Sequence, residues 1–264
     1  MNQIFLYDGD FTSFIALVVE LFKRKIKVDK ISTTEYQKGL FDECIYLEVK
    51  KKEENVDLFQ KVFPKSLIHT IYYAFLSDDK EKETTIYQFM QKYFIYKSQV
   101  FHYRTIDCIN RVIRLARKVG SEAHKLKGFL RFKELDNEIY YGVINPTNNV
   151  IEILAKHFQK RLRNEYWIIH DEKRSIYAFY NKKEIMYVKE EQIPRNLILN
   201  QKEEFIEDLW KNYFKTIAIK ERKNLRCQQN FMPKKYWKNI IEMENVYEKS
   251  NSRKRVMGDN GTNS

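Results

Sequence analysis

Apolar residues at the start of the chain follow two different periods, one typical of a strand and one of a helix. Residues 4–7 form a short apolar run, and a polar turn at Asp8 and Gly9 follows it. Beyond the turn, apolar side chains recur every three or four positions, at Phe14, Leu17, Val18, Leu21 and Phe22. This is the period of an amphipathic helix, and Asp10 is a suitable N-cap for a helix that begins at Phe11.

The rest of the chain alternates between helix and strand patterns. Residues 41–49 alternate between apolar and polar positions as a strand does. Residues 55–119 have the period of several helices, the last from about residue 100 to residue 119. Further on, the patterns predict a hairpin of residues 127–134 and 138–145, a helix over 150–162, a second hairpin within 166–180 and a helix over 201–219. We therefore expect an α+β fold: a helical block with two β-hairpins and a basic C-terminal extension.

The length and composition are those of a globular protein. With 264 residues and 43% apolar content, the chain is long enough for a real core. We expect a single α+β domain over residues 1–248 and a disordered polar tail over residues 249–264. No apolar run approaches the length of a membrane span, and the N-terminus lacks the pattern of a signal peptide, so we expect no membrane partner.

The three cysteines, Cys44, Cys108 and Cys227, are odd in number and far apart. They have neither a zinc nor an iron–sulfur spacing, and they form no disulfide framework. We interpret them as reduced thiols of a cytoplasmic protein and expect no metal and no cofactor. Standard signatures are also missing: there is no P-loop, no G-x-G-x-x-G, no G-x-S-x-G elbow and no zinc-deaminase motif.

The net charge of +12 is concentrated near the C-terminus. Residues 211–238 carry nine Lys or Arg against one acid, Glu221, a net +8, and the tail 249–264 carries four against one, a net +3. The remaining residues therefore contribute only +1. A concentrated cationic segment suggests a polyanionic partner.

Within that segment, "RKNLRCQQNFMPKKYWK" combines cations with aromatic side chains and contains no acid. Cations neutralise phosphates, and aromatic faces stack on unpaired bases. The residues expected to bind nucleic acid are Arg222, Lys223, Asn224, Arg226, Lys234, Lys235, Tyr236 and Trp237. Alternatively, Phe231, Tyr236 and Trp237 anchor a C-terminal extension on the core while the cations stay solvated.

Candidate catalytic residues are weaker. "EAHKLKGFLRF" places Glu122, His124 and Arg131 around a helix-to-strand junction, where an acid and an imidazole could act as a pair. A lone histidine on a polar segment is, however, more often an ordinary surface or hydrogen-bonding residue. His157 lies among cations on one helix and lacks a second metal ligand at helical spacing. Asp8 and Asp10 could hold a cation, although helix capping explains them better.

Five segments also resemble a family: "YDGDFTSFIALVVELF", "EAHKLKGFLRF", "YYGVINPTNNVIEILAKHFQKRL", "WIIHDEKRSIYAFY" and "YFKTIAIKERKNLRCQQNFMPKKYWK". Across residues 4–240 they are similar to a bacterial domain family of unknown function, whose members carry DNA repair or DNA metabolism labels. The domain is often encoded beside a radical-SAM protein and is sometimes fused to a uracil-DNA-glycosylase-like domain. In the family's last motif, Arg222, Asn224 and Arg226 match, but Leu225 stands where proline is usual.

The resemblance implies a role in DNA repair by association, without a demonstrated reaction. We therefore expect a DNA-binding protein that works with a radical-SAM partner. Two alternatives stay open: a stand-alone nucleic-acid-processing enzyme that uses Glu122, His124 and Arg131, and a protein-interaction module whose basic end meets an acidic protein.

Overall fold

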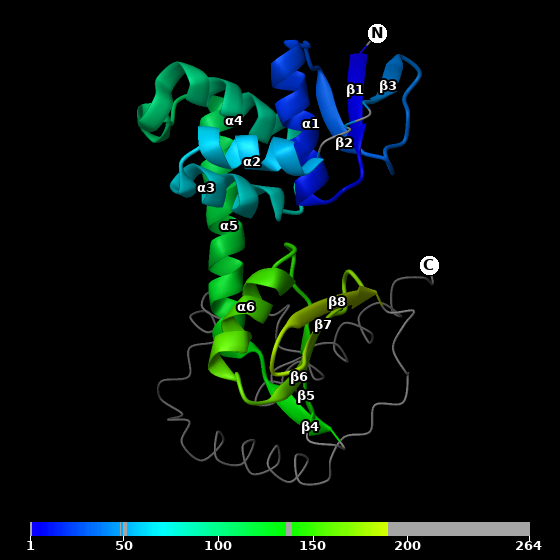
Figure 1. Cartoon of the computed structure of the whole chain (residues 1–264), viewed down its shortest axis with the longest axis vertical. Helices are drawn as coiled ribbons and strands as arrows, with labels where there is room; N and C mark the ends of the chain where they lie inside the picture. Colours follow the sequence, from blue (N-terminus) through cyan, green and yellow to red (C-terminus); the bar gives the residue numbers. More distant parts are fainter. Residues whose placement is uncertain (1, 48, 50–51, 136–138, 190–264) are drawn as a thin grey trace, which may run out of the picture. The chain divides into compact units, whose positions relative to one another are not determined.

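The computed structural model describes residues 2–47, 49, 52–135 and 139–189, which form two compact units (Figure 1). Of these described residues, those up to 121 and those at 147–149 belong to unit 1, and those at 122–146 and from 150 onwards belong to unit 2. The expected helix over 201–219 and the tail over 249–264 lie outside the described residues. Helices and two sheets occur together in the described part, which confirms the α+β class.

Unit 1 contains a three-stranded parallel sheet in the order β2-β1-β3. Its strands are β1 (Asn2–Tyr7), β2 (Lys30–Thr33) and β3 (Asp42–Tyr46). The strands expected over residues 4–7 and 41–49 are confirmed, although β3 is shorter than predicted. The central strand β1 runs into helix α1 (Phe11–Arg24), which returns the chain to β2, the crossover that a parallel pair requires.

The predicted cap of α1 is confirmed. The Asp10 backbone is extended, with φ −87° and ψ 158°, and its Oδ1 accepts a 2.8 Å hydrogen bond from the Ser13 N–H. A cap of this kind satisfies one of the unpaired N–H groups of the first helical turn. The helix ends at Lys25, which adopts a left-handed conformation with φ 54°.

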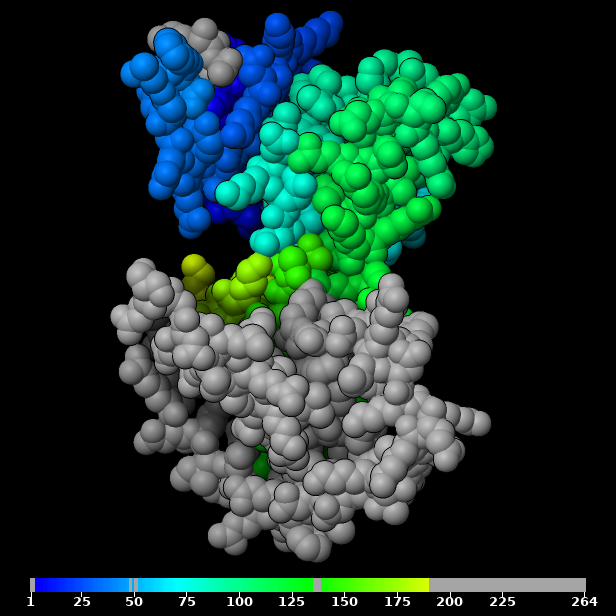
Figure 2. Space-filling view, turned by 180° about the vertical axis from the view of Figure 1, so that it is seen from behind, coloured from blue at the N-terminus to red at the C-terminus, as the bar shows by residue number. Residues whose placement is uncertain are grey.

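The other helices of unit 1 surround an aromatic core. They are α2 (Lys52–Val62), α3 (Lys65–Phe75), α4 (Lys82–Tyr96), the 3₁₀ helix η1 (Lys97–His102) and the first part of α5 (Asp107–Phe129). Phe14 of α1 stacks on Phe75 of α3 with ring centroids 5.3 Å apart, and Tyr7 of β1 lies 5.5 Å from Phe14. In a view from behind, the sheet with α1 (blue) and the later helices (cyan to green) form adjoining parts of unit 1 (Figure 2).

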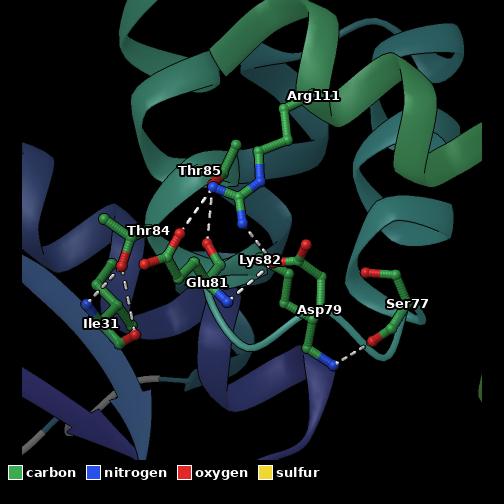
Figure 3. A network of polar contacts seen from close by, with 8 residues as sticks. All are labelled: Ile31, Ser77, Asp79, Glu81, Lys82, Thr84, Thr85 and Arg111. Atoms are coloured by element: carbon green, nitrogen blue, oxygen red, sulfur yellow. Dashed lines mark hydrogen bonds and ion pairs between the residues drawn. The ribbon is translucent and has the colours of Figure 1, made fainter. Parts of the chain in front are cut away.

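The outer edge of β2 is covered by α4. Thr84 accepts a 3.0 Å hydrogen bond from the Ile31 N–H, and its hydroxyl lies 3.5 Å from the Ile31 carbonyl as a donor (Figure 3). Ile31 is fully buried. One hydroxyl therefore satisfies both backbone groups that an edge strand leaves unpaired at this residue.

Helix α5 differs from the prediction at both ends. A 3₁₀ helix occupies residues 97–102, and α5 itself begins at Asp107 and continues to Phe129. Residues 127–129, expected in a strand, are thus helical. The reason is visible in the burial: Val119, Ala123, Leu126 and Leu130 are all buried, and their spacing continues the helical period.

Unit 2 contains a five-stranded sheet in the order β4-β5-β6-β7-β8. Its elements are β4 (Phe132–Leu135), β5 (Ile139–Ile144), α6 (Ile151–Arg161), β6 (Tyr166–Asp171), β7 (Ile176–Tyr180) and β8 (Ile185–Lys189). The β4–β5 and β6–β7 hairpins are confirmed as antiparallel pairs. Because α6 joins β5 to a parallel β6, the two hairpins belong to one sheet. Strand β8 was not predicted.

Helix α6 packs on β6 and β7 and forms the core of unit 2. The apolar spacing along this helix predicts an inward face, and its four residues are buried: Ile151, Leu154, Ala155 and Phe158. They meet a sheet face on which Trp167 and Ile169 are almost inaccessible to solvent. Trp167 also stacks on Tyr180, with ring centroids 5.1 Å apart.

Candidate functional site

The residues predicted to bind nucleic acid lie outside the part of the chain that the structure describes. They are Arg222, Lys223, Asn224, Arg226, Lys234, Lys235, Tyr236 and Trp237. The alternative anchoring role of Phe231, Tyr236 and Trp237 lies in the same range.

The predicted acid–base pair is not brought together. Glu122 and His124 both lie on α5, two residues apart, so about 200° of helix rotation separates their side chains. Glu122 is only 6% exposed, whereas His124 is exposed. The Nη1 of Arg131 donates a 2.7 Å hydrogen bond to the Gly128 carbonyl, at the end of the helix. The burial of Glu122 and its separation from His124 leave the two side chains without the geometry of an acid–base pair.

Unit 2 instead gathers cations on two stretches that contain no acid, residues 125–133 and residues 156–163. We call them the α5–α6 cations: Lys125, Lys127, Arg131, Lys133, Lys156, Lys160, Arg161 and Arg163. The four on or just after α6 are exposed, and the four at the end of α5 and the start of β4 are half-buried. A half-buried lysine or arginine can pack its aliphatic stem while its charged end reaches water.

Two observations connect the two stretches. The rings of Phe132 and Phe158 meet edge to face at 5.0 Å, which joins the start of β4 to α6. In addition, the pKa of His157 on α6 lies below its ordinary 6.5, first because of burial and then because Lys127 and Arg161 repel the protonated form. Lys127 and Arg161 therefore act on the same imidazole from different elements.

The imidazole of His157 has an unusual environment. The Nε2 of His157 is buried and has no hydrogen-bond partner among the residues that the structure describes. A neutral imidazole can donate or accept one hydrogen bond at that atom, and a protonated one donates. An anion that approached Lys127 and Arg161 would offset their repulsion and favour protonation of His157.

In the predicted second hairpin, the polar run "HDEKR" suggests a turn at His170 and Asp171, but in the structure they are the last two residues of β6. Asp171 still organises the turn after it: Oδ1 accepts from the Lys173 N–H at 3.1 Å, and Oδ2 forms a 3.1 Å ion pair with Arg174. Burial raises the pKa of this fully buried carboxyl, and Arg174 opposes the rise. The contacts of Asp171 are those of a structural residue.

His170 belongs to an aromatic group on the sheet. Its ring lies parallel to that of Tyr177, with centroids 4.0 Å apart, and its Nδ1 is 2.8 Å from the Tyr141 hydroxyl. Cross-strand aromatic pairs of this kind stabilise a sheet. The spacing of "IIHDEKR" could not show this contact, because Tyr141 lies on another strand.

In unit 1, Asp8 lies at the carboxyl end of the central strand and is engaged by three side chains. Its Oδ1 accepts from the Tyr46 hydroxyl at 2.7 Å, and its Oδ2 contacts Lys52 Nζ at 2.7 Å and the Ser13 hydroxyl at 3.3 Å. The hydrogen bonds from Lys52 and Tyr46 lower the pKa of Asp8. Lys52 thus occupies the place beside Asp8 where a cation would bind, while Asp10 caps α1.

Arg111 of α5 forms a second polar network in unit 1 (Figure 3). Its guanidinium reaches Glu81 Oε2 at 2.7 Å and Asp79 Oδ1 at 2.8 Å, and the same Asp79 oxygen accepts from the Glu81 N–H at 2.9 Å. These ion pairs raise the pKa of Arg111. Arg111 therefore fixes the segment before α4 through its ion pairs with Asp79 and Glu81. Arg114 and Arg117, on the same helix, are exposed.

No cluster of three or more His, Cys, Asp or Glu side chains within the described ranges could hold a metal ion. Cys44 and Cys108 are both free thiols, and burial raises the pKa of Cys108. None of the described helices combines the length and apolar character needed to cross a membrane.

These features define an α+β chain with a cationic surface on its second unit. The family described as domain of unknown function DUF4130 matches residues 80–242, more than half of the 264 residues, and the chain belongs to this family. The match confirms the resemblance to a domain of unknown function. It includes every α5–α6 cation and begins after the strands of unit 1. No curated protein matches the chain.

Proposed function

We propose that the protein binds DNA through the α5–α6 cations, together with the basic segment over residues 211–238, and acts in DNA repair or DNA metabolism. The observation that carries the proposal is the gathering of eight cations, without an acid, on residues 125–133 and 156–163, two stretches that the ring contact of Phe132 with Phe158 brings together. Phosphate oxygens are the acceptors that such a group of donors fits.

The charge distribution supports the same conclusion. Eight cations without an acid in residues 125–133 and 156–163 add to the net +8 of residues 211–238. Neutralised phosphates release counterions, so a surface of this kind binds nucleic acid without depending strongly on sequence. The aromatic residues Tyr236 and Trp237 would add stacking on unpaired bases.

The resemblance to a family whose members carry DNA repair labels supports a role in that process. We propose a cytoplasmic protein that works with a radical-SAM protein as its enzymatic partner, while this chain supplies DNA contact. The separation of Glu122 from His124 on α5 weakens the alternative of a stand-alone enzyme built on that pair. The same cations could instead bind an acidic protein, and the binding experiment below distinguishes that partner from DNA.

The test is a titration of a labelled DNA duplex, at several salt concentrations, with wild type and two double variants. Lys160→Ala/Arg161→Ala removes two exposed α5–α6 cations. Lys61→Ala/Lys65→Ala, the matched control, removes two exposed cations of unit 1. If both removed side chains contact phosphate, the slope of log K against log salt becomes shallower by about 1.8, and the control keeps the wild-type slope.

Two results would contradict the proposal. The first is an absence of binding to micromolar DNA at low salt, which would leave an acidic protein as the better partner. The second is equal loss of affinity in the two double variants, because binding would then respond to net charge and not to this surface. Circular dichroism spectra of the variants would show that each is folded.

A further inference from the structure

The connection between β2 and β3 holds two large apolar side chains in solvent. The turn at residues 39–42 is closed by a 3.2 Å hydrogen bond from the Asp42 N–H to the Gly39 carbonyl. Leu40 and Phe41, its two central residues, are 90% and 72% exposed. Turns prefer small polar residues, glycine or proline at these positions. Two adjacent apolar residues there require a reason other than chain reversal.

The turn is fixed by side chains on both sides of it. Asp42 Oδ2 accepts from the Gly39 N–H at 2.9 Å and from the Tyr36 hydroxyl at 2.8 Å. A Cβ added at Gly39 would lie 2.7 Å from the same Asp42 oxygen, so a larger residue would displace this contact. Lys30 lies over the Tyr36 ring, 4.4 Å from its centroid. Leu40 and Phe41 are thus presented by an ordered turn, which reduces the entropy that binding would cost.

The strand that follows the turn is an edge of the sheet. Among the described residues β3 pairs with β1 alone, and Figure 1 shows it on the outer side of that strand. The opposite edge, β2, is covered by Thr84. A strand that is paired on one side only within the described residues, next to two exposed apolar side chains, is suited to an extended segment of another protein, which can add hydrogen bonds to the strand.

The charges around the turn select the class of partner. Residues 29–43 contain Asp29, Glu35, Asp42 and Glu43 against Lys30 and Lys38, a net −2 within a chain of +12. Carboxylates repel the phosphates of nucleic acid and of anionic lipid. They favour a protein surface that carries lysine or arginine, since complementary charges steer association and select partners.

We propose that residues 39–46, the turn with β3, form a docking surface for a protein partner with an apolar pocket bordered by lysine or arginine. The pocket takes Leu40 and Phe41, and the basic border meets Asp42 and Glu43. The surface belongs to unit 1 and uses none of the α5–α6 cations. It therefore goes beyond the proposed DNA binding, and the two ideas fail independently.

The experiment places a photo-activated cross-linking amino acid at position 41 of the full chain in the native host, with the same probe at Ile95 as control. Ile95 is 64% exposed on α4, so it tests for apolar contact in general. We expect one protein to be cross-linked from position 41 and not from position 95, through a surface that contains apolar residues next to lysine or arginine.

The cross-linked protein is then purified and titrated with wild type and variants. Leu40→Ser/Phe41→Ser should weaken binding roughly tenfold or more, as the loss of apolar anchors does at interfaces. Glu43→Lys should weaken it most at low salt. Gly39→Ala keeps both apolar residues but disturbs the Asp42 contact, so a smaller loss is expected. Ile95→Ser should bind like wild type.

Several results would overturn the proposal. The first is that position 41 cross-links to a second copy of the chain, to DNA or to lipid, and to no other protein. The second is that no protein is cross-linked from position 41 more strongly than from position 95. The third is that the wild type and the Leu40→Ser/Phe41→Ser variant bind the partner with equal affinity. Flotation with phosphatidylcholine–phosphatidylserine vesicles and sedimentation velocity of the purified protein separate the lipid and self-association outcomes.

Discussion

The Tyr7 hydroxyl donates a 2.9 Å hydrogen bond to Oε1 of Glu83, 76 residues further along the chain, and both side chains are buried. The contact joins the end of β1 to the first turn of α4. Burial, followed by the charge of Glu83, raises the pKa of Tyr7 far above its ordinary value, so the phenol remains a neutral donor. Burial also raises the pKa of Glu83 above 4.5, opposed mainly by Lys82.

Replacing Glu83 with glutamine should change how the stability of the protein depends on pH. Because folding raises the pKa of Glu83, the folded state binds more protons between 4.5 and the folded-state pKa, and the free energy of unfolding falls as pH rises through that window. For one proton the slope is at most about 1.4 kcal/mol per pH unit. In Glu83→Gln this fall is absent, while the amide oxygen still accepts from Tyr7.

Urea unfolding at pH values from below 4.5 to neutral would check this prediction, by comparing the wild type with Glu83→Gln. The variant should gain stability relative to wild type as pH rises. Tyr7→Phe is the control for the hydrogen bond itself, because it keeps the aromatic ring and removes the hydroxyl that donates to Glu83. We expect it to cost about 1–3 kcal/mol through the unsatisfied carboxyl. If the free energy of unfolding changes with pH in the same way for wild type and Glu83→Gln, folding does not raise the pKa of Glu83.

The hydroxyl of Thr84, and not its methyl group, should account for the contribution of this side chain to the stability of the sheet. Thr84→Val keeps the shape of the side chain but leaves the N–H and carbonyl of the buried Ile31 without their partner. The expected loss is about 1–3 kcal/mol in the free energy of unfolding. Thr84→Ser keeps the hydroxyl and should lose much less. Urea midpoints measure both, and equal losses would mean that packing of the methyl group, not edge coverage, is the important contribution.

Local features of the fold could be predicted from the sequence because their determinants lie within a few residues. The Asp10 cap, both hairpins and the inward residues of α6 follow from short-range patterns, and the structure confirms them. The parallel pairing of β1 with β3 could not be predicted, since Ile4 pairs with Cys44 across a long segment. The short strand β2 has no distinct pattern of its own.

The candidate site was predictable only in its charge. The runs of Lys and Arg are visible in the sequence, but the combined effect of Lys127 and Arg161 on the imidazole of His157 depends on the tertiary arrangement of their elements. Glu122 and His124 are neighbours in sequence, yet helical rotation separates them. Glu83, in the polar segment "KEKETTIYQF", is buried because its partner Tyr7 comes from another element.

DNA binding should raise the pKa of His157. In the free protein, burial, Lys127 and Arg161 hold it below 6.5, and bound phosphates would offset the two cations. Affinity should therefore rise as pH falls through the interval between the pKa values of the free and bound protein. NMR titration of the histidine ring signals, with and without a DNA duplex, measures the shift, and His69 of unit 1 is the internal control. An unchanged pKa of His157 in the saturated complex would place the phosphates elsewhere.

The C-terminal residues outside the described ranges should divide into two roles, which a pair of variants separates. Burying a large aromatic side chain contributes about 1.5–3 kcal/mol, so Trp237→Ala should lower the melting temperature if Trp237 anchors the extension. Solvated arginines contribute little to stability but contact phosphates, so Arg222→Ala/Arg226→Ala should melt like wild type. The double variant should bind DNA more weakly, with a salt slope shallower by about 1.8.

Thermal melts and salt-dependent DNA titrations of the two variants distinguish these roles, and Lys61→Ala/Lys65→Ala again serves as the control for charge. If Trp237→Ala melts like wild type yet loses DNA affinity, Trp237 is a stacking platform for bases and the anchoring argument is wrong. If the double arginine variant unfolds at a lower temperature, those cations stabilise the fold. The basic C-terminal segment would then contribute to folding, and the α5–α6 cations would have to account for DNA binding by themselves.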